Sequence, residues 1–291
     1  MLKPFIVDVT LRDGEQTPGV AFSTREKAII ALMLDRLGVY QIEAGIPAMG
    51  EIEQQAIKTI VLMGLRSRVS TWNRMVLDDV RASLACGVKA LHVSAPVSSL
   101  HIRHKLGRSR TWVLTRMKEV LRYALSHGCA VTVGAEDASR AEESFLLEFA
   151  LTAMNSGAER LRYCDTVGVL DPFSTFERIS RLREKAPIPL EFHGHNDFGM
   201  ATANALAALK AGCGYVDVTV GGLGERAGNT SLEELTAALY GIYGIRPALE
   251  SRILGLLGRY VSRAANRITG RHPYVATDRR GVTPGLTCAL P

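Results

Sequence analysis

Two histidines, His193 and His195, stand two positions apart at the end of a short apolar run. Alternate residues of a strand point to the same face, so both imidazoles of this segment can bind one metal ion. The spacing alone is a weak indication, because two histidines on a strand more often lie in a core or on a surface. Asn196 and Asp197 follow directly and add polar groups at the same point, which favours a functional interpretation.

A second polar segment, residues 8–16, contains Arg12 next to Asp13. By itself such a neighbouring pair is more often a structural ion pair. Beside two histidines, a carboxylate completes a ligand set that suits a divalent Lewis acid and leaves positions for an oxygen-donating substrate and water. The sequence therefore predicts a metal site made by Asp13, His193 and His195.

Glycines recur through residues 221–228, and Asn229 follows them. A glycine-rich loop can turn backbone N–H groups towards an anion, and the Asn229 amide adds a neutral oxygen donor. A plain flexible loop is an equally open interpretation. The GxGxxG, Walker A, HExxH and GxSxG patterns do not occur in the sequence, so these better-known sites are excluded.

The elements that must position these groups alternate regularly between short β-branched runs and longer amphipathic stretches. Eight strands are predicted, at residues 5–8, 41–44, 68–72, 90–94, 130–134, 160–165, 190–193 and 215–220. Eight helices are predicted between and after them, at 24–37, 51–63, 78–86, 112–127, 141–156, 172–185, 202–211 and 231–242. Ser23 with Glu26 forms a capping-box pattern, and Asp171 before Pro172 provides an N-cap followed by proline.

Eight β–α units of about thirty residues each predict a (β/α)8 TIM barrel. A doubly wound open sheet is the alternative, but it would usually bring a dinucleotide fingerprint after the first strand. In a barrel the carboxyl ends of all strands open at one face. Because one strand separates the first from the seventh around the ring, Asp13 is expected to reach an ion held by His193 and His195.

The last part of the chain differs from the rest. Residues 1–245 are predicted to form the catalytic barrel domain, and residues 246–291 a C-terminal helix near 252–265 followed by a truncated or disordered tail. The prediction of an irregular tail rests on the loss of hydrophobic periodicity over the last 25 residues.

Composition limits the classes of function. Hydrophobic residues make up 47% and charged residues 22% of the 291 residues, which argues against intrinsic disorder. The net charge of +6 is spread without a long basic block, and aromatics are 6%, so no nucleic-acid partner is expected. No uncharged apolar run approaches the length of a membrane span. Five widely spaced cysteines predict free thiols and a cytoplasmic location.

Three segments together resemble the signature of the metal-dependent Claisen-condensing barrels. They are DGEQ at 13–16, HGHND at 193–197 and GERAGN at 224–229. This family includes isopropylmalate, citramalate and homocitrate synthases. Residues 45–50 and 94–98, with KLGR at 105–108, most resemble the nitrogen-fixation type of homocitrate synthase, and the likeness covers about residues 3–266.

The resemblance implies a transferase that condenses acetyl-CoA with 2-oxoglutarate to give homocitrate and CoA, and that forms a homodimer. An isopropylmalate or citramalate synthase, using another 2-oxo acid, is the alternative. The cofactor it implies is a divalent ion (Mg, Mn or Zn), with Asp13, His193 and His195 as ligands and Asn229 at a nearby fourth position.

The same resemblance implies roles for residues around the metal. Arg12 matches the arginine that polarises the keto oxygen and stabilises developing negative charge, and Glu136 matches a glutamate that handles a proton. Substrate contacts are implied for Gln16, Glu43, Thr166 and Arg103, the last as a clamp for a distal carboxylate. The basic segment 98–110 around Arg103 could also bind CoA phosphates, or be a solvated loop.

Synthases of this family continue past the barrel into a helical lid with a histidine-rich segment. Here the resemblance stops after Arg267, and His272 is the only later histidine. A further alternative is therefore a barrel that binds a metal and a 2-oxo acid but has impaired catalysis, because the lid is missing.

Overall fold

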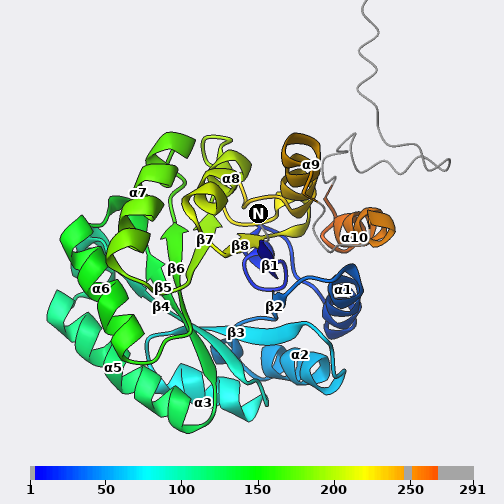
Figure 1. Ribbon diagram of the computed structural model, residues 1–291. Helices are drawn as coiled ribbons and strands as arrows, with labels where there is room; N and C mark the ends of the chain where they lie inside the picture. The colour runs from blue at the N-terminus through cyan, green and yellow to red at the C-terminus, as the bar shows by residue number, and fades with distance from the viewer. Residues whose placement is uncertain (1–3, 246–250, 268–291) are drawn as a thin grey trace, which may run out of the picture.

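The computed structural model describes residues 4–245 and 251–267. Its eight strands close into a barrel in sequence order, and each strand pairs in parallel with its neighbours, β8 with β1 included. Figure 1 shows the helices arranged around the outside of the strands. The predicted (β/α)8 barrel is therefore confirmed.

The strands are short and follow one another around the ring. Their bounds are β1 Phe5–Asp8, β2 Gln41–Glu43, β3 Arg68–Arg74, β4 Ala90–Pro96, β5 Ala130–Glu136, β6 Arg160–Asp165, β7 Leu190–Gly194 and β8 Tyr215–Val218.

The helices of the described residues cover the barrel wall. Their bounds are α1 Thr24–Leu37, α2 Glu51–Leu62, α3 Leu77–Ala85, α4 Ser99–His101, α5 Arg110–Ser126, α6 Glu143–Asn155, α7 Pro172–Lys185, α8 Ala201–Ala211, α9 Leu232–Tyr243 and α10 Ser251–Ala264.

Local sequence signals explain where several helices begin. Ser23 and Glu26 form the predicted capping box at α1, each side chain accepting a hydrogen bond from the other residue's backbone N–H. Asp171 caps α7 ahead of Pro172 by accepting from the backbone of Phe173 and Ser174. These caps set the point at which the chain enters each helix, and with it the length of the preceding βα loop.

Strand bounds differ from the prediction mainly at the carboxyl ends. Strands β3, β4 and β5 run two residues further than predicted, whereas β8 ends at Val218 rather than at residue 220. The reason at β8 is a change of hydrogen-bond partner. The Val220 N–H donates to Thr10 Oγ1, 2.9 Å away, rather than to a neighbouring strand.

Helix α10 confirms the helix predicted near residues 252–265. It lies beside α1 in Figure 1 and buries Leu254, Leu257 and Val261 in the shared hydrophobic core. The tail predicted for residues 268–291 lies outside the described residues, and the division at residue 245 stays a prediction. Within the described residues, no helix is both long and apolar enough to cross a membrane.

The inside of the barrel is polar. Arg160 on β6 donates to Gln41 on β2 across the ring, at 2.6 Å, and also to Glu191 on β7. Arg162 on β6 contacts Glu191 and lies 3.0 Å from Asp217 on β8. Barrel interiors are commonly filled by branched apolar side chains. This interior instead holds a layer of buried ion pairs beneath the open face.

Candidate metal centre and active-site cavity

A single cavity gathers most of the residues singled out from the sequence, at the carboxyl ends of the strands. Those that line it are Arg12, Asp13, Gln16, Glu136, Thr166, His193 and His195. Glu43, Asn229 and Arg103 are not in its lining. The strand ends therefore bring the chemistry-bearing residues to one place, as parallel closure of the barrel requires.

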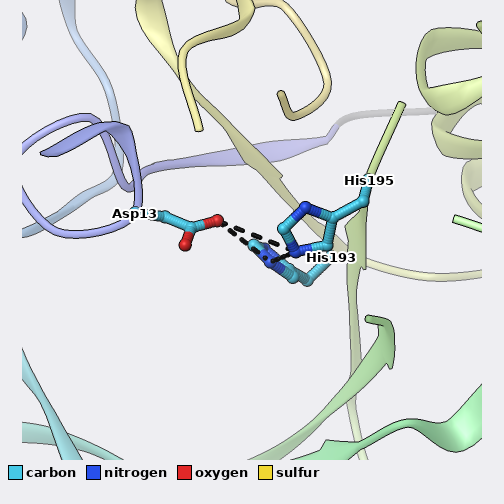
Figure 2. A group of neighbouring side chains, drawn as sticks. All are labelled: Asp13, His193 and His195. Atoms are coloured by element: carbon cyan, nitrogen blue, oxygen red, sulfur yellow. Dashed lines mark hydrogen bonds and ion pairs between the residues drawn. The ribbon is translucent and has the colours of Figure 1, made fainter. Parts of the chain in front are cut away.

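Asp13, His193 and His195 form a compact buried group (Figure 2). Asp13 Oδ2 lies 3.4 Å from His193 Nε2 and 3.9 Å from His195 Nε2, and the two Nε2 atoms are 3.2 Å apart. One potential ligand atom from each residue lies within 4.8 Å of the others. A carboxylate and two imidazoles converging in this way are a ligand set for a divalent ion.

Unpaired polar atoms show that these residues fit a metal. Asp13 Oδ2 and Asn229 Oδ1 are buried and accept no hydrogen bond from any described residue. Buried carboxylate and amide oxygens are rarely left in that state in proteins. Asn229 reaches this region because its backbone pairs with His195 in an antiparallel bridge, while its Nδ2 donates to the Leu223 carbonyl at 2.8 Å.

Asp217 orients the first histidine. Its Oδ2 lies 3.0 Å from His193 Nδ1, so the other ring nitrogen, Nε2, faces Asp13. A carboxylate behind a ligating imidazole commonly fixes the ring and raises its basicity. Sequence analysis did not single out Asp217, although its place on β8, beside Val7 of β1 in the strand register, was a usable signal.

The pKa values of the three residues are shifted in different directions. Burial would raise the pKa of Asp13, but Arg12 and the His193 ring outweigh it and hold that pKa well below its usual range. Burial lowers the pKa of His193, yet the neighbouring Asp13 and Asp217 carboxylates raise it to about 9. Burial and the neighbouring His193 lower the pKa of His195 to about 3. Asp13 is therefore an anion and His195 a neutral ring at neutral pH.

Arg12 lies against this group. Its Nη1 donates to Asp13 Oδ1 at 2.9 Å, and its Nε to Glu43 Oε1 at 2.5 Å. Glu43 is fully buried beneath the cavity, and burial, which raises its pKa, is outweighed by Arg162 and Arg12, which lower it. Two carboxylates therefore fix the Arg12 guanidinium in the cavity wall next to the candidate metal site.

Glu136, at the end of β5, also lines the cavity. Lys105 Nζ donates to its Oε1 at 2.5 Å, and His101 Nδ1 lies 3.2 Å from the same oxygen. Both partners belong to the basic segment 98–110, which is helical rather than a loop: α4 continues into a π-helical turn, Ile102–Leu106. Such turns often occur at functional sites. Arg103 on this turn is exposed.

Thr166 and Gln16 line the cavity from two further loops. Thr166 Oγ1 accepts a hydrogen bond from the Asp137 backbone at 2.8 Å, which ties the ends of β5 and β6 together. Gln16 is exposed at the mouth. Both are placed to meet a ligand that enters from the open face.

The glycine-rich loop is closed on itself rather than open to an anion. The N–H groups of Gly221, Gly222, Gly224 and Gly228 donate to protein oxygens, those of Glu233, Thr219, Thr17 and Glu225 respectively. Arg226 holds the loop by donating to Asp197 at 2.8 and 2.9 Å and to the Thr166 carbonyl at 2.7 Å. The anion-cradle interpretation of these N–H groups is therefore not supported.

Several cavity residues were not found from the sequence. They are Trp72, His92, Arg162 and Cys164, whereas Ser94, Lys105 and Glu225 lie in segments that the sequence had singled out. Their signal is the alternation of polar with apolar residues inside the strands, as in Arg160–Asp165. That alternation identifies an inward face only once the barrel is known to be closed.

Comparisons with known proteins agree with the geometry. A family model described as HMGL-like matches residues 3–254. The chain is 50% identical over 263 residues to 2-isopropylmalate synthase 2 of Caldanaerobacter subterraneus, which covers 90% of this chain and 68% of the relative. It is 49% identical over 265 residues to homocitrate synthase 1 of Nostoc sp., which covers 91% of this chain and 70% of the relative.

Among solved structures, hydroxymethylglutaryl-CoA lyase from Pseudomonas aeruginosa matches with a TM-score of 0.82 at 23% identity. The match covers 94% of this chain and 97% of that chain. At this level of identity, the likeness supports the barrel fold alone.

Proposed function

The chain belongs to the HMGL-like family, and we propose that it is a homocitrate synthase, an acyltransferase that condenses acetyl-CoA with 2-oxoglutarate. The observation that carries the proposal is the buried group of Asp13, His193 and His195 in one cavity with Arg12. Support for this activity comes from the similarity to a relative named homocitrate synthase.

Asp13, His193 and His195 would hold a divalent ion, with Asn229 as an additional oxygen donor. Such an ion supplies Lewis-acid polarisation of a 2-oxo acid, which makes the keto carbon electrophilic. The fixed positions of Asp13 and of His193, held by Arg12 and by Asp217 respectively, keep the ligand atoms converged before substrate arrives.

Arg12 would stabilise the negative charge that develops on the acceptor oxygen during carbon–carbon bond formation. Its guanidinium is held from two sides by Asp13 and Glu43, so little reorganisation is needed as charge appears. Preorganised donors of this kind are worth about 10²–10³ in rate.

Glu136 would accept the proton removed from the methyl group of the acetyl thioester. It lines the cavity mouth and is held by Lys105 and His101, two donors that keep its carboxylate in place. General-base assistance contributes roughly 10²–10⁴ in rate. Thr166 and Gln16 would contact the acceptor acid.

A second candidate is an isopropylmalate synthase with the same chemistry and a branched 2-oxo acid as acceptor. The observation that favours it is the 50% identity to a relative of that name. The two candidates differ only in what the cavity accepts beyond the shared 2-oxo acid group.

The test is a thiol-release assay on the full chain with acetyl-CoA, a divalent metal (Mg, Mn or Zn) and a panel of 2-oxo acids, with products identified by mass spectrometry. We expect release of CoA with 2-oxoglutarate, formation of homocitrate, and loss of both on chelation. Product from 2-oxoisovalerate alone would select the isopropylmalate synthase, and no release with any acid would contradict both. Analytical ultracentrifugation of the same sample tests the proposed homodimer.

A further inference from the structure

The turn after β5 holds its backbone in an unfavourable conformation directly behind Glu136. Asp137 has a φ of 61° and a ψ of 37°, in the left-handed region. Residues that carry a Cβ rarely adopt this conformation, and they keep it only where the surrounding contacts fix it. Because residues of this kind cluster at functional sites, the contacts that hold Asp137 indicate what the turn does.

The peptide group between Glu136 and Asp137 is fixed from both sides. The Glu136 carbonyl accepts from the Val97 N–H at 2.9 Å, and the Asp137 N–H donates to Thr166 Oγ1 at 2.8 Å. Val97 directly follows β4, and Thr166 directly follows β6. The end of β5 is therefore held by the loops after its two neighbouring strands.

The Asp137 side chain is fully buried, and its two oxygens accept from two side chains. Arg140 donates to both, with Nε 2.8 Å from Oδ1 and Nη2 2.8 Å from Oδ2, and Ser98 Oγ donates to Oδ2. A guanidinium that contacts a carboxylate at two points holds it in one orientation. The bonds from Arg140 and Ser98 therefore stabilise the left-handed backbone at Asp137.

Arg140 also reaches the ring that contacts the Glu136 carboxylate. Its Nη2 has two protons to give, and it lies 3.2 Å from His101 Nε2 as well as 2.8 Å from Asp137 Oδ2. In the neutral ring Nε2 therefore accepts, and the ring proton sits on Nδ1, which lies 3.2 Å from Glu136 Oε1. One arginine thus supports both the backbone behind Glu136 and a donor to its carboxylate.

We propose that Asp137 and Arg140 are positioning residues for Glu136, and that the left-handed turn they hold keeps its carboxylate where it takes the proton of the acetyl thioester. This role rests on the proposed function and deepens it by naming what fixes the base. Neither residue lines the cavity, and the candidate metal ligands come from the ends of β1 and β7. Loss of the turn should therefore slow proton transfer and leave metal and acceptor binding in place.

The experiment separates proton transfer from the other steps. Thiol release by the full chain at saturating metal is measured with acetyl-CoA and with acetyl-CoA deuterated at the methyl group, using the 2-oxo acid that the wild type turns over fastest. The variants are Asp137→Ala, Asp137→Gly, Arg140→Ala and Arg140→Lys. Asp78→Ala is the matched control, because Asp78 also pairs with an arginine three residues later but on the exposed surface of α3.

We expect kcat of Asp137→Ala and Arg140→Ala to fall on the order of 10- to 100-fold, since a small misplacement of a catalytic group has effects of this size. Both should show a clear deuterium isotope effect on kcat, at least as large as that of the wild type. The KM for the 2-oxo acid and the bound metal should stay nearly unchanged, and Asp78→Ala should behave like the wild type.

The conservative variants test the turn itself. Glycine adopts positive φ without strain, so Asp137→Gly should keep more activity than Asp137→Ala. Arg140→Lys keeps the charge and one donor group, so it should lose less than Arg140→Ala. If Asp137→Ala does not fold, Asp137→Gly and the two Arg140 variants carry the same comparison with the wild type.

Full kcat in both alanine variants would overturn the proposal, and so would slower turnover without an isotope effect. A parallel loss of bound metal or a rise in the KM for the 2-oxo acid would overturn it too, because the disturbance would then not be confined to the base. These outcomes leave an active synthase. Absence of thiol release from the wild type with every 2-oxo acid would instead contradict the proposed function, and this role with it.

Discussion

At the scale of single residues, Asp13 divides its two carboxylate oxygens between two neighbours. Oδ1 accepts from Arg12, whereas Oδ2 faces the Nε2 atoms of His193 and His195. Because its pKa is held well below the usual range, the carboxylate is charged at neutral pH. Asp13 therefore supplies the anionic ligand, and the two histidines supply imidazole nitrogens.

Replacing Asp13 by Asn should therefore remove the anionic ligand while leaving the shape nearly unchanged. We expect affinity for Mn²⁺ or Zn²⁺ to fall by on the order of 100-fold or more, since even residues that only orient a metal ligand are worth 10–100-fold. Equilibrium dialysis followed by metal analysis measures it. Asp78→Asn, at an exposed aspartate on α3, is the control and should bind like the wild type; equal binding by the Asp13 variant would contradict the assignment.

Arg12 should matter for turnover beyond its contact with Asp13. Arg12→Ala removes a donor fixed beside the site, and we expect CoA release, measured at saturating metal so that the ion stays bound, to fall by on the order of 10²-fold or more. Steady-state thiol release and metal analysis on one preparation separate the two effects. Full activity in this variant, or loss of metal in parallel with activity, would show that the role is wrong.

The site was predictable where side chains follow strand ends and hidden where they lie inside the barrel. His193 and His195 could be found because two histidines at alternate positions end a strand, and Asp13 because the first strand lies near the seventh. Arg162 and His92 could not, because their contacts cross the barrel between strands distant in sequence. Only the closed barrel shows which face of each strand points inward and which distant strands lie opposite each other.

At the scale of elements, a chain of hydrogen bonds from Asp8 through Thr10 to Val220 joins the loops after β1 and β8. Asp8 Oδ1 accepts from the Thr10 N–H at 2.9 Å, Thr10 Oγ1 donates to Asp8 Oδ2 at 3.0 Å, and the same Oγ1 accepts from the Val220 N–H. The hydrogen bond to Thr10 takes the Val220 N–H out of the strand pairing, and β8 ends at Val218. Residue patterns along one strand do not contain that information.

Titration of Asp8 makes the stability of the fold depend on pH. Burial raises the pKa of Asp8 from 3.8 to about 7 in the folded chain, so the unfolded chain loses this proton at lower pH. The contribution of Asp8 to stability is therefore fullest below pH 4 and is lost as the pH rises to about 7. Asp8→Asn should stabilise the fold above pH 7 relative to the wild type, on the order of 1–4 kcal/mol.

Urea unfolding of both proteins between pH 5 and pH 8 measures the difference in free energy of unfolding. We expect this difference to grow in favour of Asp8→Asn over that range. A difference that does not change with pH would show that the carboxyl titrates normally.

The loop after β8 depends on a close backbone approach at Gly228. Its φ is +90°, and a Cβ there would lie 2.0 Å from the Gly222 carbonyl oxygen. Gly228→Ala should displace Asn229, which pairs with His195, and destabilise the fold on the order of 1–3 kcal/mol. The unfolding temperature and the metal affinity should both fall. Gly241→Ala, at a helical site where a Cβ would meet no atom within 4 Å, should leave both unchanged. Matching behaviour of the two variants would contradict this view of the loop.

At the scale of the whole molecule, the fold was predictable because each β–α unit carries its own signal. Eight alternations gave the barrel, and glycines such as Gly38 and Gly212, both with positive φ, end helices where expected. The helical form of the segment with Lys105 and His101 was not predictable. Its π-helical turn is fixed by contacts to Glu136 on the neighbouring strand rather than by its own sequence.

The barrel also concentrates charge in a closed interior. Arg160 and Arg162 are fully buried and pair with Glu43, Glu191 and Asp217 from three other strands. Buried pairs of this kind cost desolvation and are costly to break. Glu43 also contacts Arg12, and Asp217 also contacts His193. The buried ion pairs are therefore connected to the candidate metal site through both carboxylates.

Anomalous scattering from crystals soaked with Mn²⁺ and 2-oxoglutarate would locate the ion and the acid in the cavity. We predict one peak in contact with Asp13 Oδ2 and the Nε2 atoms of His193 and His195, with the acid bound at the same ion. In Asp13→Asn crystals soaked in the same way, that peak should be lost. A peak elsewhere in the wild type, or an undiminished peak in the variant, would contradict the account.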